Sequence, residues 1–577
     1  MLKLTRFIKP YWFVALLGPL FMLLEVCMDL LQPRLMASIV NDGVMLGDLG
    51  HIAQTGLIML MVAIVGLVGG ACCTIFSTIA SQNFGADLRQ KLFQKVQSLS
   101  IRSLDHFGAG TIVTRLTGDI TQLQTVVMMV LRVFARGSFM IIGSLIMAFT
   151  ISPKLSLILL AMIPLLVVFL VVTTRVTIPL FSTVQQRLDQ VNTVMQENLS
   201  GIRVVKAFVR SDYEEARFGE SNTNFLHASL KAAKVVALNT PIMSIILNFS
   251  VVGALYYGGV LSEEGSLSVG NLAAFLTYIT QLLQSTLGLG NQLMVISRAK
   301  ASADRVNEVL DDVSSEEAVA DKESLSTAST LHAGRLEFRG VGFSYEGRTA
   351  KHAVLHNINL IAEPGQTLGI VGVNGAGKST LVSLIPRFYD VTEGEILIDS
   401  INVNNLEPEQ LHRQVGMVLQ QALLFSGTIR DNIRYGKPEA LQEEVEAAAS
   451  AAQAHDFIMN LQDGYDTMLG QRGVNLSGGQ KQRLAIARTL LMKPKIVILD
   501  DCTSAVDLNT DLRIRQSLNN IMQDSTCIII GQRIASIEHA DRIIVLEHGE
   551  ITAEGTHHEL LSRSQLYRDI ARSQQGA

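Results

Sequence analysis

The chain has 577 residues, of which 48% are hydrophobic and only 17% are charged, and its mean hydropathy is +0.32. This composition excludes a disordered protein, because disordered chains are rich in charge and poor in apolar residues. The formal net charge of −5 gives no basic excess for nucleic-acid binding, and the five cysteines lack the spacing of a zinc site or a disulfide framework. A membrane portion joined to a soluble portion is the simplest explanation.

Apolar stretches long enough to cross a bilayer lie before residue 300. A membrane-spanning helix needs about 20 apolar residues. Two of the stretches are weaker, the first because Glu25 and Asp29 interrupt it and the last because it contains Gln and Asn. We predict an all-α membrane domain of six transmembrane helices, near 12–31, 55–80, 126–150, 155–175, 236–260 and 269–293.

Basic residues alternate between the predicted loops and indicate the orientation of the spans. They are concentrated before residue 12 and in segments 81–120 and 175–234, whereas the other loops hold one or none. The positive-inside rule therefore places the N-terminus and both long segments in the cytoplasm. Apolar residues recur at helical spacing within these segments, so we expect long cytoplasmic helical extensions that turn at Asp105–Gly110 and Arg210–Glu215.

Four ionisable residues lie within the predicted spans. Glu25 and Asp29 are one helical turn apart in the first span, and Arg132 and Arg136 are one turn apart in the third. Intramembrane charges are candidates for function, and acidic groups in a cavity would suit cationic amphiphiles. The alternative interpretation is that these residues pair with one another or face water near the ends of the spans.

The composition changes after the membrane portion. Segment 311–334 is rich in Ser, Asp and Glu, which is typical of a solvated linker. Beyond it, short β-like runs alternate with helical patterns, which predicts an α/β domain with a largely parallel sheet. We therefore expect a membrane domain over 1–310, a linker over 311–334 and the α/β domain over 335–577.

A phosphate-binding motif opens the α/β domain. The segment Gly372–Thr380 matches GxxxxGK[ST], with an apolar strand before it and a helical pattern after it. Its glycines let backbone N–H groups surround phosphates, Lys378 should reach the β- and γ-phosphates, and Ser379 should bind Mg²⁺. The predicted ATP-binding residues here are Gly372, Asn374, Gly375, Ala376, Gly377, Lys378, Ser379 and Thr380.

Two further motifs accompany this loop. The apolar run Ile496–Asp500 ends in a carboxylate that should hold Mg²⁺. The run Leu476-Ser477-Gly478-Gly479-Gln480 precedes a helical pattern and predicts a second cradle for phosphate at a helix N-terminus. Since one nucleotide does not need two cradles from one subunit, the second cradle implies a dimer in which it meets the partner's ATP.

Together these motifs resemble the ABC transporters, specifically exporters with six membrane helices fused to one nucleotide-binding domain. The resemblance covers essentially the whole chain and implies ATP and Mg²⁺ as cofactors. It implies that Tyr345 stacks on adenine and that Gln420 is the Q-loop residue, which contacts Mg²⁺ with Ser379 and Asp500. It also makes Asp507 the D-loop aspartate and Ser477–Gln480 the signature motif.

Two positions depart from the family pattern. The family places Glu after the strand-end aspartate to polarise water, and here that residue is Asp501; the family's switch histidine is replaced by Gln532. The shorter side chain withdraws the carboxylate by one methylene, and a misplacement of about 1 Å can already cost on the order of a hundredfold in rate. Glutamine cannot become cationic as imidazole can. We therefore expect a site that binds ATP and hydrolyses it poorly.

A homodimer would contain two impaired sites, so we expect a heterodimer. Its partner would be a homologous half-transporter that carries the catalytic Glu and the switch His. The resemblance implies ATP-driven export of hydrophobic small molecules, expected to be amphiphilic drugs, across the bacterial cytoplasmic membrane, with the nucleotide-binding domain in the cytoplasm. A lipid or peptide exporter and a gated channel or regulator of the same architecture remain alternatives.

Overall fold

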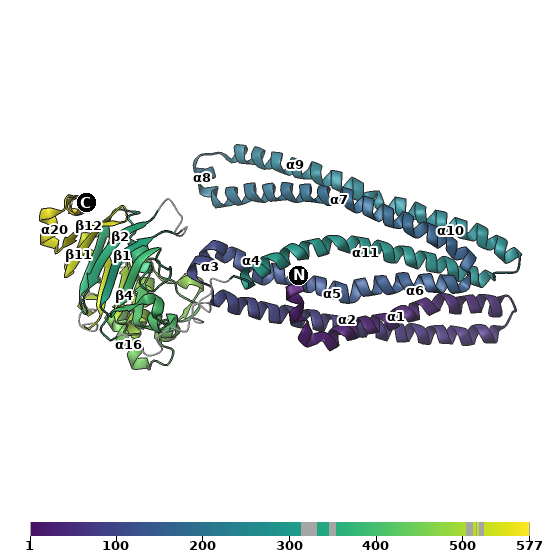
Figure 1. The fold of residues 1–577 in the computed structure, drawn as a ribbon, viewed down its shortest axis with the longest axis horizontal. Coiled ribbons are helices and arrows are strands. Elements are labelled where there is room, and N and C mark those ends of the chain that lie inside the picture. Colours follow the sequence, from purple (N-terminus) through teal and green to yellow (C-terminus); the bar gives the residue numbers. More distant parts are fainter. Residues whose placement is uncertain are drawn as a thin grey trace. The chain divides into compact units, whose positions relative to one another are not determined.

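The structure is a computed structural model that describes residues 2–312, 332–345, 353–502, 510, 512–514, 516–517 and 524–575. The chain divides into two compact units. The helical unit comprises Met1–Gln97 and Gly110–Asp311, and the α/β unit comprises Ser98–Ala109 and Asp312–Ala577 (Figure 1). Most of the predicted linker, residues 313–331, lies outside the described residues.

The helical unit consists of long rods. Its main helices are α1 (Trp12–Ser38), α2 (Leu49–Gln97), α5 (Ile120–Met129), α6 (Ala135–Ile151), α7 (Pro153–Ser200), α9 (Ser211–Ala237), α10 (Asn239–Glu263) and α11 (Val269–Leu310). The short helix α4 (Ala109–Thr114) and two π-helical segments, Arg115–Asp119 and Val130–Phe134, connect α5 and α6 into one rod. The confirmed fold class is thus a helical membrane domain joined to an α/β domain.

Five rods in the described part of the chain are long and apolar enough to cross a membrane. They cover Lys9–Val44, Leu49–Gln97, Ala109–Ile151, Pro153–Ser200 and Ser211–Glu263. The sixth predicted span lies within α11, a single helix of 42 residues that contains Gln281 and Gln284 and falls outside this set. Its polar residues are those that weakened the prediction.

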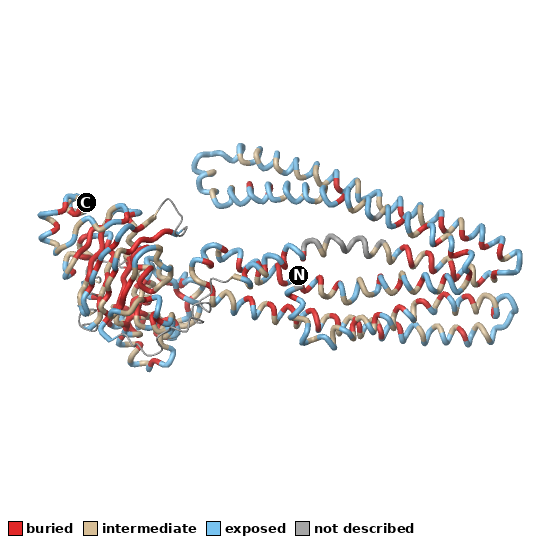
Figure 2. Tube along the Cα trace, in the orientation of Figure 1, coloured by how far each residue is buried: buried red, intermediate tan, exposed pale blue. Residues whose placement is uncertain are grey.

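Many large apolar residues of these rods are exposed, and Figure 2 colours much of each rod as exposed. Such exposed apolar residues are expected where lipid rather than water surrounds the helices. Inside, Tyr278 of α11 is fully buried and its hydroxyl donates to the Leu30 carbonyl of α1 at 2.6 Å. The helices also approach closely at Gly85, where a Cβ atom would lie only 1.9 Å from Gln124 Nε2. A larger residue there would force the Gln124 side chain to move.

The two predicted cytoplasmic turns contain short helices. The first is α3 (Ile101–Phe107), after which Gly108, at φ +72°, makes the turn inside the predicted segment. The second is α8 (Ile202–Ala207), and here the prediction of a turn at Arg210–Glu215 was wrong because α9 already begins at Ser211. Two of the three acidic residues in this segment, Asp212 and Glu214, instead occupy the first helical turn, where the helix dipole favours negative charge.

The described residues of the α/β unit form two main sheets and a two-stranded one, β7 (Gly427–Thr428) with β8 (Met468–Leu469). The antiparallel sheet has the order β2-β1-β4-β5, formed by Leu355–Ala362, Leu336–Phe343, Glu393–Ile398 and Ile401–Asn402. The larger sheet has the order β12-β11-β3-β10-β9-β6, formed by Glu550–Gly555, Arg542–Glu547, Thr367–Gly372, Thr526–Ile530, Ile496–Asp500 and Val415–Val418. All its pairs are parallel except β11 with β12. The largely parallel sheet agrees with the alternating sequence pattern.

The topology of the larger sheet brings the motifs together. Strand β10 lies between β3 and β9, and Ile530 at its end is paired with Ile370 on one side and Asp500 on the other. Because parallel strands end at the same edge, the loop after β3 and the aspartate of β9 meet there. Helices pack around this sheet: α13 (Lys378–Ser383), α14 (Pro408–Gln414), α15 (Ile429–Arg434), α16 (Gln442–Ala451), α17 (His455–Met459), α18 (Gly478–Leu491), α20 (His557–Arg563) and α21 (Gln565–Gln575).

Candidate nucleotide-binding site

The loop between β3 and α13 depends on its glycines. Gly375 and Gly377 have φ values of +81° and +98°, in the left-handed region that side chains rarely adopt. A Cβ atom on Gly372 would lie 2.1 Å from the Leu546 carbonyl oxygen. The backbone can therefore pass this close to β11 only without a side chain, which leaves the loop free to wrap around a ligand.

This loop forms one side of a pocket of about 400 Å³ at the edge of the sheet. The pocket brings together ten residues that were predicted from separate motifs: Asn374, Gly375, Gly377, Lys378, Ser379, Thr380, Gln420, Asp500, Asp501 and Gln532. Val354 and Ile530 also line it, and nothing in their sequence context marked them as site residues. Gly372 and Ala376 belong to the loop backbone but do not line the pocket.

Lys378, Ser379 and Asp500 form the polar centre of the pocket. Lys378 Nζ donates to the carbonyl oxygens of Gly372 and Val373 at 2.9 and 3.0 Å, and burial lowers its pKa. Ser379 Oγ donates to Asp500 Oδ1 at 3.2 Å, and burial raises the pKa of Asp500. The hydroxyl and carboxylate oxygens, with the Gln420 amide nearby, are the hard oxygen donors that suit Mg²⁺. A Mg²⁺ ion bound with ATP would supply the positive charge that favours ionised Asp500.

Asp501 follows Asp500 in a left-handed backbone conformation, with φ at +45°. Its N–H donates to the Ile530 carbonyl at 3.0 Å, and its Oδ2 accepts from Gln420 Nε2 at 3.3 Å. Burial raises the pKa of Asp501, although hydrogen bonds from Gln420 and from the Gln532 backbone oppose this. The short side chain of Asp501 is therefore held toward Gln420 by this hydrogen bond.

Sequence reasoning missed the residue that supports Gln532. Gln574, in the C-terminal helix α21, donates through Nε2 to the Gln532 carbonyl at 2.7 Å. Its Oε1 accepts from the Ile534 N–H, also at 2.7 Å. One carboxamide thus holds the backbone on both sides of Arg533. Only the fold brings these groups together, because 42 residues separate Gln574 from Gln532.

Tyr345 lies beside the pocket and does not line it. Its side chain is 47% exposed and its hydroxyl lies 3.0 Å from Thr380 Oγ1. The Tyr345 ring meets Tyr389 edge-on at 5.3 Å, and the Tyr389 hydroxyl donates to Asp105 Oδ2 of α3 at 2.5 Å. Burial and the Asp105 carboxylate raise the pKa of Tyr389, so the phenol stays a donor. The residue predicted to stack on adenine is thereby connected to α3.

The predicted signature motif begins α18 and does not line the pocket. Ser477 caps this helix: its Oγ accepts from the Gln480 N–H at 3.3 Å, and its own N–H donates to Gln480 Oε1 at 2.9 Å. Gly478 and Gly479 occupy the first turn, where N–H groups have no partner within the helix. These groups are available to a ligand other than the one in this chain's pocket. Asp507 lies outside the described residues.

The four ionisable residues of the membrane spans are partly joined. Arg136 forms ion pairs with both Glu25 and Asp29. Arg132 is exposed, and within the described residues it forms no ion pair. Pairing between the two helices is therefore realised for three of the four residues, and Asp29 and Arg136 also line a pocket between the helices.

Comparisons with known proteins cover both units. Residues 15–286 match the family described as "ABC transporter transmembrane region", and residues 355–504 match the family described as "ABC transporter". An uncharacterised ABC transporter ATP-binding protein of Bacillus subtilis, YfiB, is 41% identical over 100% of this chain and 99% of its own length. An ATP-dependent lipid A-core flippase of Syntrophus aciditrophicus is 34% identical over 88% of this chain and 83% of its own length.

A second protein of Bacillus subtilis, YgaD, whose name assigns it provisionally to multidrug export, is 34% identical over 99% of this chain and 98% of its own length. The solved structure of a bacterial Atm1-family ABC exporter with ATP bound matches with a TM-score of 0.78 and 27% identity. That match covers 100% of this chain and 99% of the other. The likeness thus extends over both units.

Proposed function

This chain belongs to the ABC transporter family, as a transmembrane region fused to one nucleotide-binding domain, and we propose that it is the degenerate-site subunit of a heterodimeric exporter of amphiphilic compounds. ATP-driven transport and a multi-pass location in the bacterial cell membrane follow from the family itself. The heterodimer, the weak ATP site and the class of substrate are the parts we propose.

The weak ATP site is supported by the juxtaposition of Asp501 and Gln532 in a pocket whose other groups suit Mg²⁺–ATP. In phosphoryl transfer, the protein contributes mainly positioning and electrostatic stabilisation. A carboxylate one methylene short, held toward Gln420, is poorly placed to orient water. The amide of Gln532 supplies no cationic charge near the γ-phosphate. Binding should therefore survive while hydrolysis slows.

A dimer is supported by the placement of the signature motif, and the weak ATP site makes two different chains the better arrangement. Ser477–Gln480 lies outside this chain's own pocket and leaves the first-turn N–H groups of α18 for another nucleotide. A second chain that carries Glu and His would complete one efficient site with this signature. ATP binding would then close the two nucleotide-binding domains, hydrolysis at the efficient site would reset them, and this chain would retain its ATP for longer.

The substrate class is supported by the relatives and by the polar pocket between the membrane helices. The name of YgaD assigns it provisionally to multidrug export. The Syntrophus aciditrophicus protein is named as a lipid A-core flippase. Both compound classes are amphiphilic. A lipid is therefore the second candidate substrate, and the relative named as a flippase is the observation that favours it.

The test is nucleotide occupancy in the assembled transporter. The tagged chain would be isolated from its native membrane, the co-purifying half-transporter identified and the pair reconstituted in liposomes. After a few turnovers with labelled ATP, we expect intact ATP on this chain and ADP on its partner. Efficient hydrolysis by this chain alone, near the usual enzymatic rate of about 10 per second, would overturn the proposal.

A further inference from the structure

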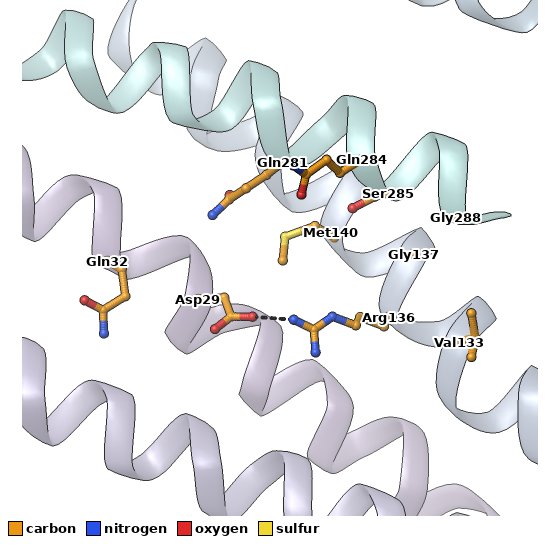
Figure 3. Close-up of a pocket in the computed structure, with 10 residues that line it drawn as sticks. All are labelled: Asp29, Gln32, Val133, Arg136, Gly137, Met140, Gln281, Gln284, Ser285 and Gly288. Atoms are coloured by element: carbon orange, nitrogen blue, oxygen red, sulfur yellow. Dashed lines mark hydrogen bonds and ion pairs between the residues drawn. The ribbon is translucent and has the colours of Figure 1, made fainter. Parts of the chain in front are cut away.

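A polar pocket lies between α1, α6 and α11 of the helical unit (Figure 3). Its volume is about 530 Å³, and sites for drug-sized ligands typically measure about 300–1,000 Å³. Asp29 and Arg136 face each other at its floor, and Gln281, Gln284 and Ser285 of α11 lie opposite them. Three separate helices thus place polar groups around one space inside the membrane domain.

The two carboxylates that hold Arg136 differ in their surroundings. Glu25 accepts from Arg136 Nη1, and its side chain is only 15% exposed. It packs so closely on α2 that a Cβ atom at Gly70 would lie 2.8 Å from Glu25 Oε2. Asp29 accepts from Arg136 Nη2 at 2.9 Å, but its side chain is 37% exposed and lines the pocket. Glu25 is therefore the fixed partner, and Asp29 is the accessible one.

The ion-paired group of three, two carboxylates and one guanidinium, has a formal charge of −1. This unequal count favours a cation over an anion beside the exposed Asp29. Arg132 does not line the pocket, and within the described residues it makes no ion pair with Glu25 or Asp29. A cationic ligand would supply the missing positive charge, whereas an anionic ligand would add to the excess.

The remaining lining residues define the rest of the ligand. Asp29 lines the pocket, and the carboxamides of Gln281 and Gln284, which also line it, can accept or donate hydrogen bonds. The Gln281 Oε1 atom is buried without a hydrogen-bond partner in the described structure. Met140 and Val133 add apolar surface, and methionine adapts to different shapes. A ligand with N–H donors on a positive group and an apolar body would satisfy these features together.

We propose that this pocket binds protonated amphiphilic amines, with the ammonium N–H groups on Asp29 and the Gln281 carboxamide. The inference rests on the proposed export of amphiphilic compounds and specifies their charge and their hydrogen-bonding group. Arg136 remains on Glu25 when the amine binds, so Asp29 exchanges one cationic partner for another. The pocket discriminates against neutral and anionic analogues of the same size.

Binding of dansylcadaverine, a fluorescent primary amine, would test this in nucleotide-free protein in lipid nanodiscs. The matched probes are its neutral N-acetyl derivative and its trimethylammonium derivative, which keeps the charge but has no N–H on the cationic group. We expect fluorescence anisotropy to show the tightest binding for the amine and the weakest for the acetyl compound. Asp29→Asn should weaken amine binding about tenfold and leave acetyl binding unchanged.

Asp42→Asn is the control, because Asp42 is a carboxylate of the same unit that does not line the pocket. Arg136→Lys provides a second variant if Asp29→Asn fails to fold. Lysine keeps the positive charge but cannot pair with Glu25 and Asp29 through two separate guanidinium nitrogens, so the preference among the three probes should change. Equal binding of the amine and acetyl probes would overturn the proposal, as would an amine preference that survives both substitutions. Amine binding is measured without nucleotide, so its outcome does not depend on whether the two ATP sites differ. A transporter that hydrolyses ATP through two equal sites would refute the proposed function but would leave the amine-binding result standing.

Discussion

Replacing Asp501 with Glu should accelerate hydrolysis at this chain's own ATP site. The substitution adds one methylene, which advances the carboxylate by about 1.5 Å from its present hydrogen bond with Gln420 toward the pocket. Because a misplacement of about 1 Å can cost on the order of a hundredfold, the rate should rise between about 10- and 100-fold. That gain corresponds to about 1.4–2.7 kcal/mol of transition-state stabilisation.

The backbone at this position limits the gain. Residue 501 has a φ of +45°, and Asp tolerates the left-handed region better than Glu does. A left-handed backbone costs an ordinary residue about 1–2 kcal/mol. This cost falls on the stability of the segment after β9 rather than on the chemical step. We therefore expect Asp501→Glu to be faster but slightly less thermostable, and Asp501→Glu with Gln532→His to be the fastest variant.

Single-turnover hydrolysis is the suitable assay. The assembled transporter, in excess over labelled ATP, would carry a partner whose catalytic Glu is replaced by Gln, so that only this chain's site reports. Asp501→Asn is the matched control and should remove the residual rate. If Asp501→Glu binds ATP normally but changes the rate less than about twofold, the position of this carboxylate does not limit hydrolysis and the reasoning is refuted.

Four further predictions concern other contacts. Tyr389→Phe keeps the ring against Tyr345 but removes the hydrogen bond to Asp105. ATP affinity should therefore be retained, while substrate-stimulated ATPase activity should fall several-fold. Unchanged stimulation in liposomes would count against a role for the hydrogen bond between Tyr389 and Asp105. Gln574→Leu removes two hydrogen bonds from the segment around Gln532, each worth about 1 kcal/mol. Hydrogen exchange of the backbone amides in this segment should therefore become faster. Gln574→Glu is the control, because it can still accept from the Ile534 N–H but cannot donate to the Gln532 carbonyl. Gly479→Asp should abolish hydrolysis at the partner's site without weakening ATP binding to this chain, because the residue does not line this chain's pocket; equilibrium ATP titration of both sites measures this. Asp399 accepts backbone N–H groups of His332, Ala333 and Arg335 at 2.8–3.0 Å; burial alone would raise its pKa, but these donors outweigh burial and hold the pKa below its usual range. The stabilisation by Asp399 is therefore fully present above the ordinary carboxyl pKa of about 4 and is lost as pH falls from there through the lower pKa of the folded state. Asp399→Asn should speed exchange of these amides at pH 7, and its effect should shrink progressively as the pH is lowered below about 4.

The sequence predicts elements and motifs better than the contacts between them. Short-range patterns predicted the loop before Lys378 and the strand that ends at Asp500, and hydropathy together with the family resemblance predicted the fold class. The exact place of the second cytoplasmic turn was less predictable, since Asp212 and Glu214 suit a loop tip and a helical first turn equally well.

Contacts across the fold left no signal in the sequence. Tyr389 and Asp105 are 284 residues apart, and neither belongs to a recognised motif. For Arg136 and its carboxylate partners the signal was partial, since pairing among the four charged residues was one of two interpretations. Their helical spacing predicts two pairs on two helix faces, but only the packing of α1 against α6 shows that one arginine serves both carboxylates and leaves Arg132 aside.

The order of strands in the larger sheet also has a consequence for biosynthesis. Strand β3 carries the phosphate-binding loop, yet its two neighbours in the sheet, β10 and β11, begin only at Thr526 and Arg542. A ribosome therefore completes the membrane helices and most of the α/β unit before this loop gains its flanking strands. The nascent chain should stay unable to hold ATP until nearly its last residues emerge. Premature termination after Asp500 would leave a membrane-inserted product with every phosphate-binding residue of the loop and no formed site.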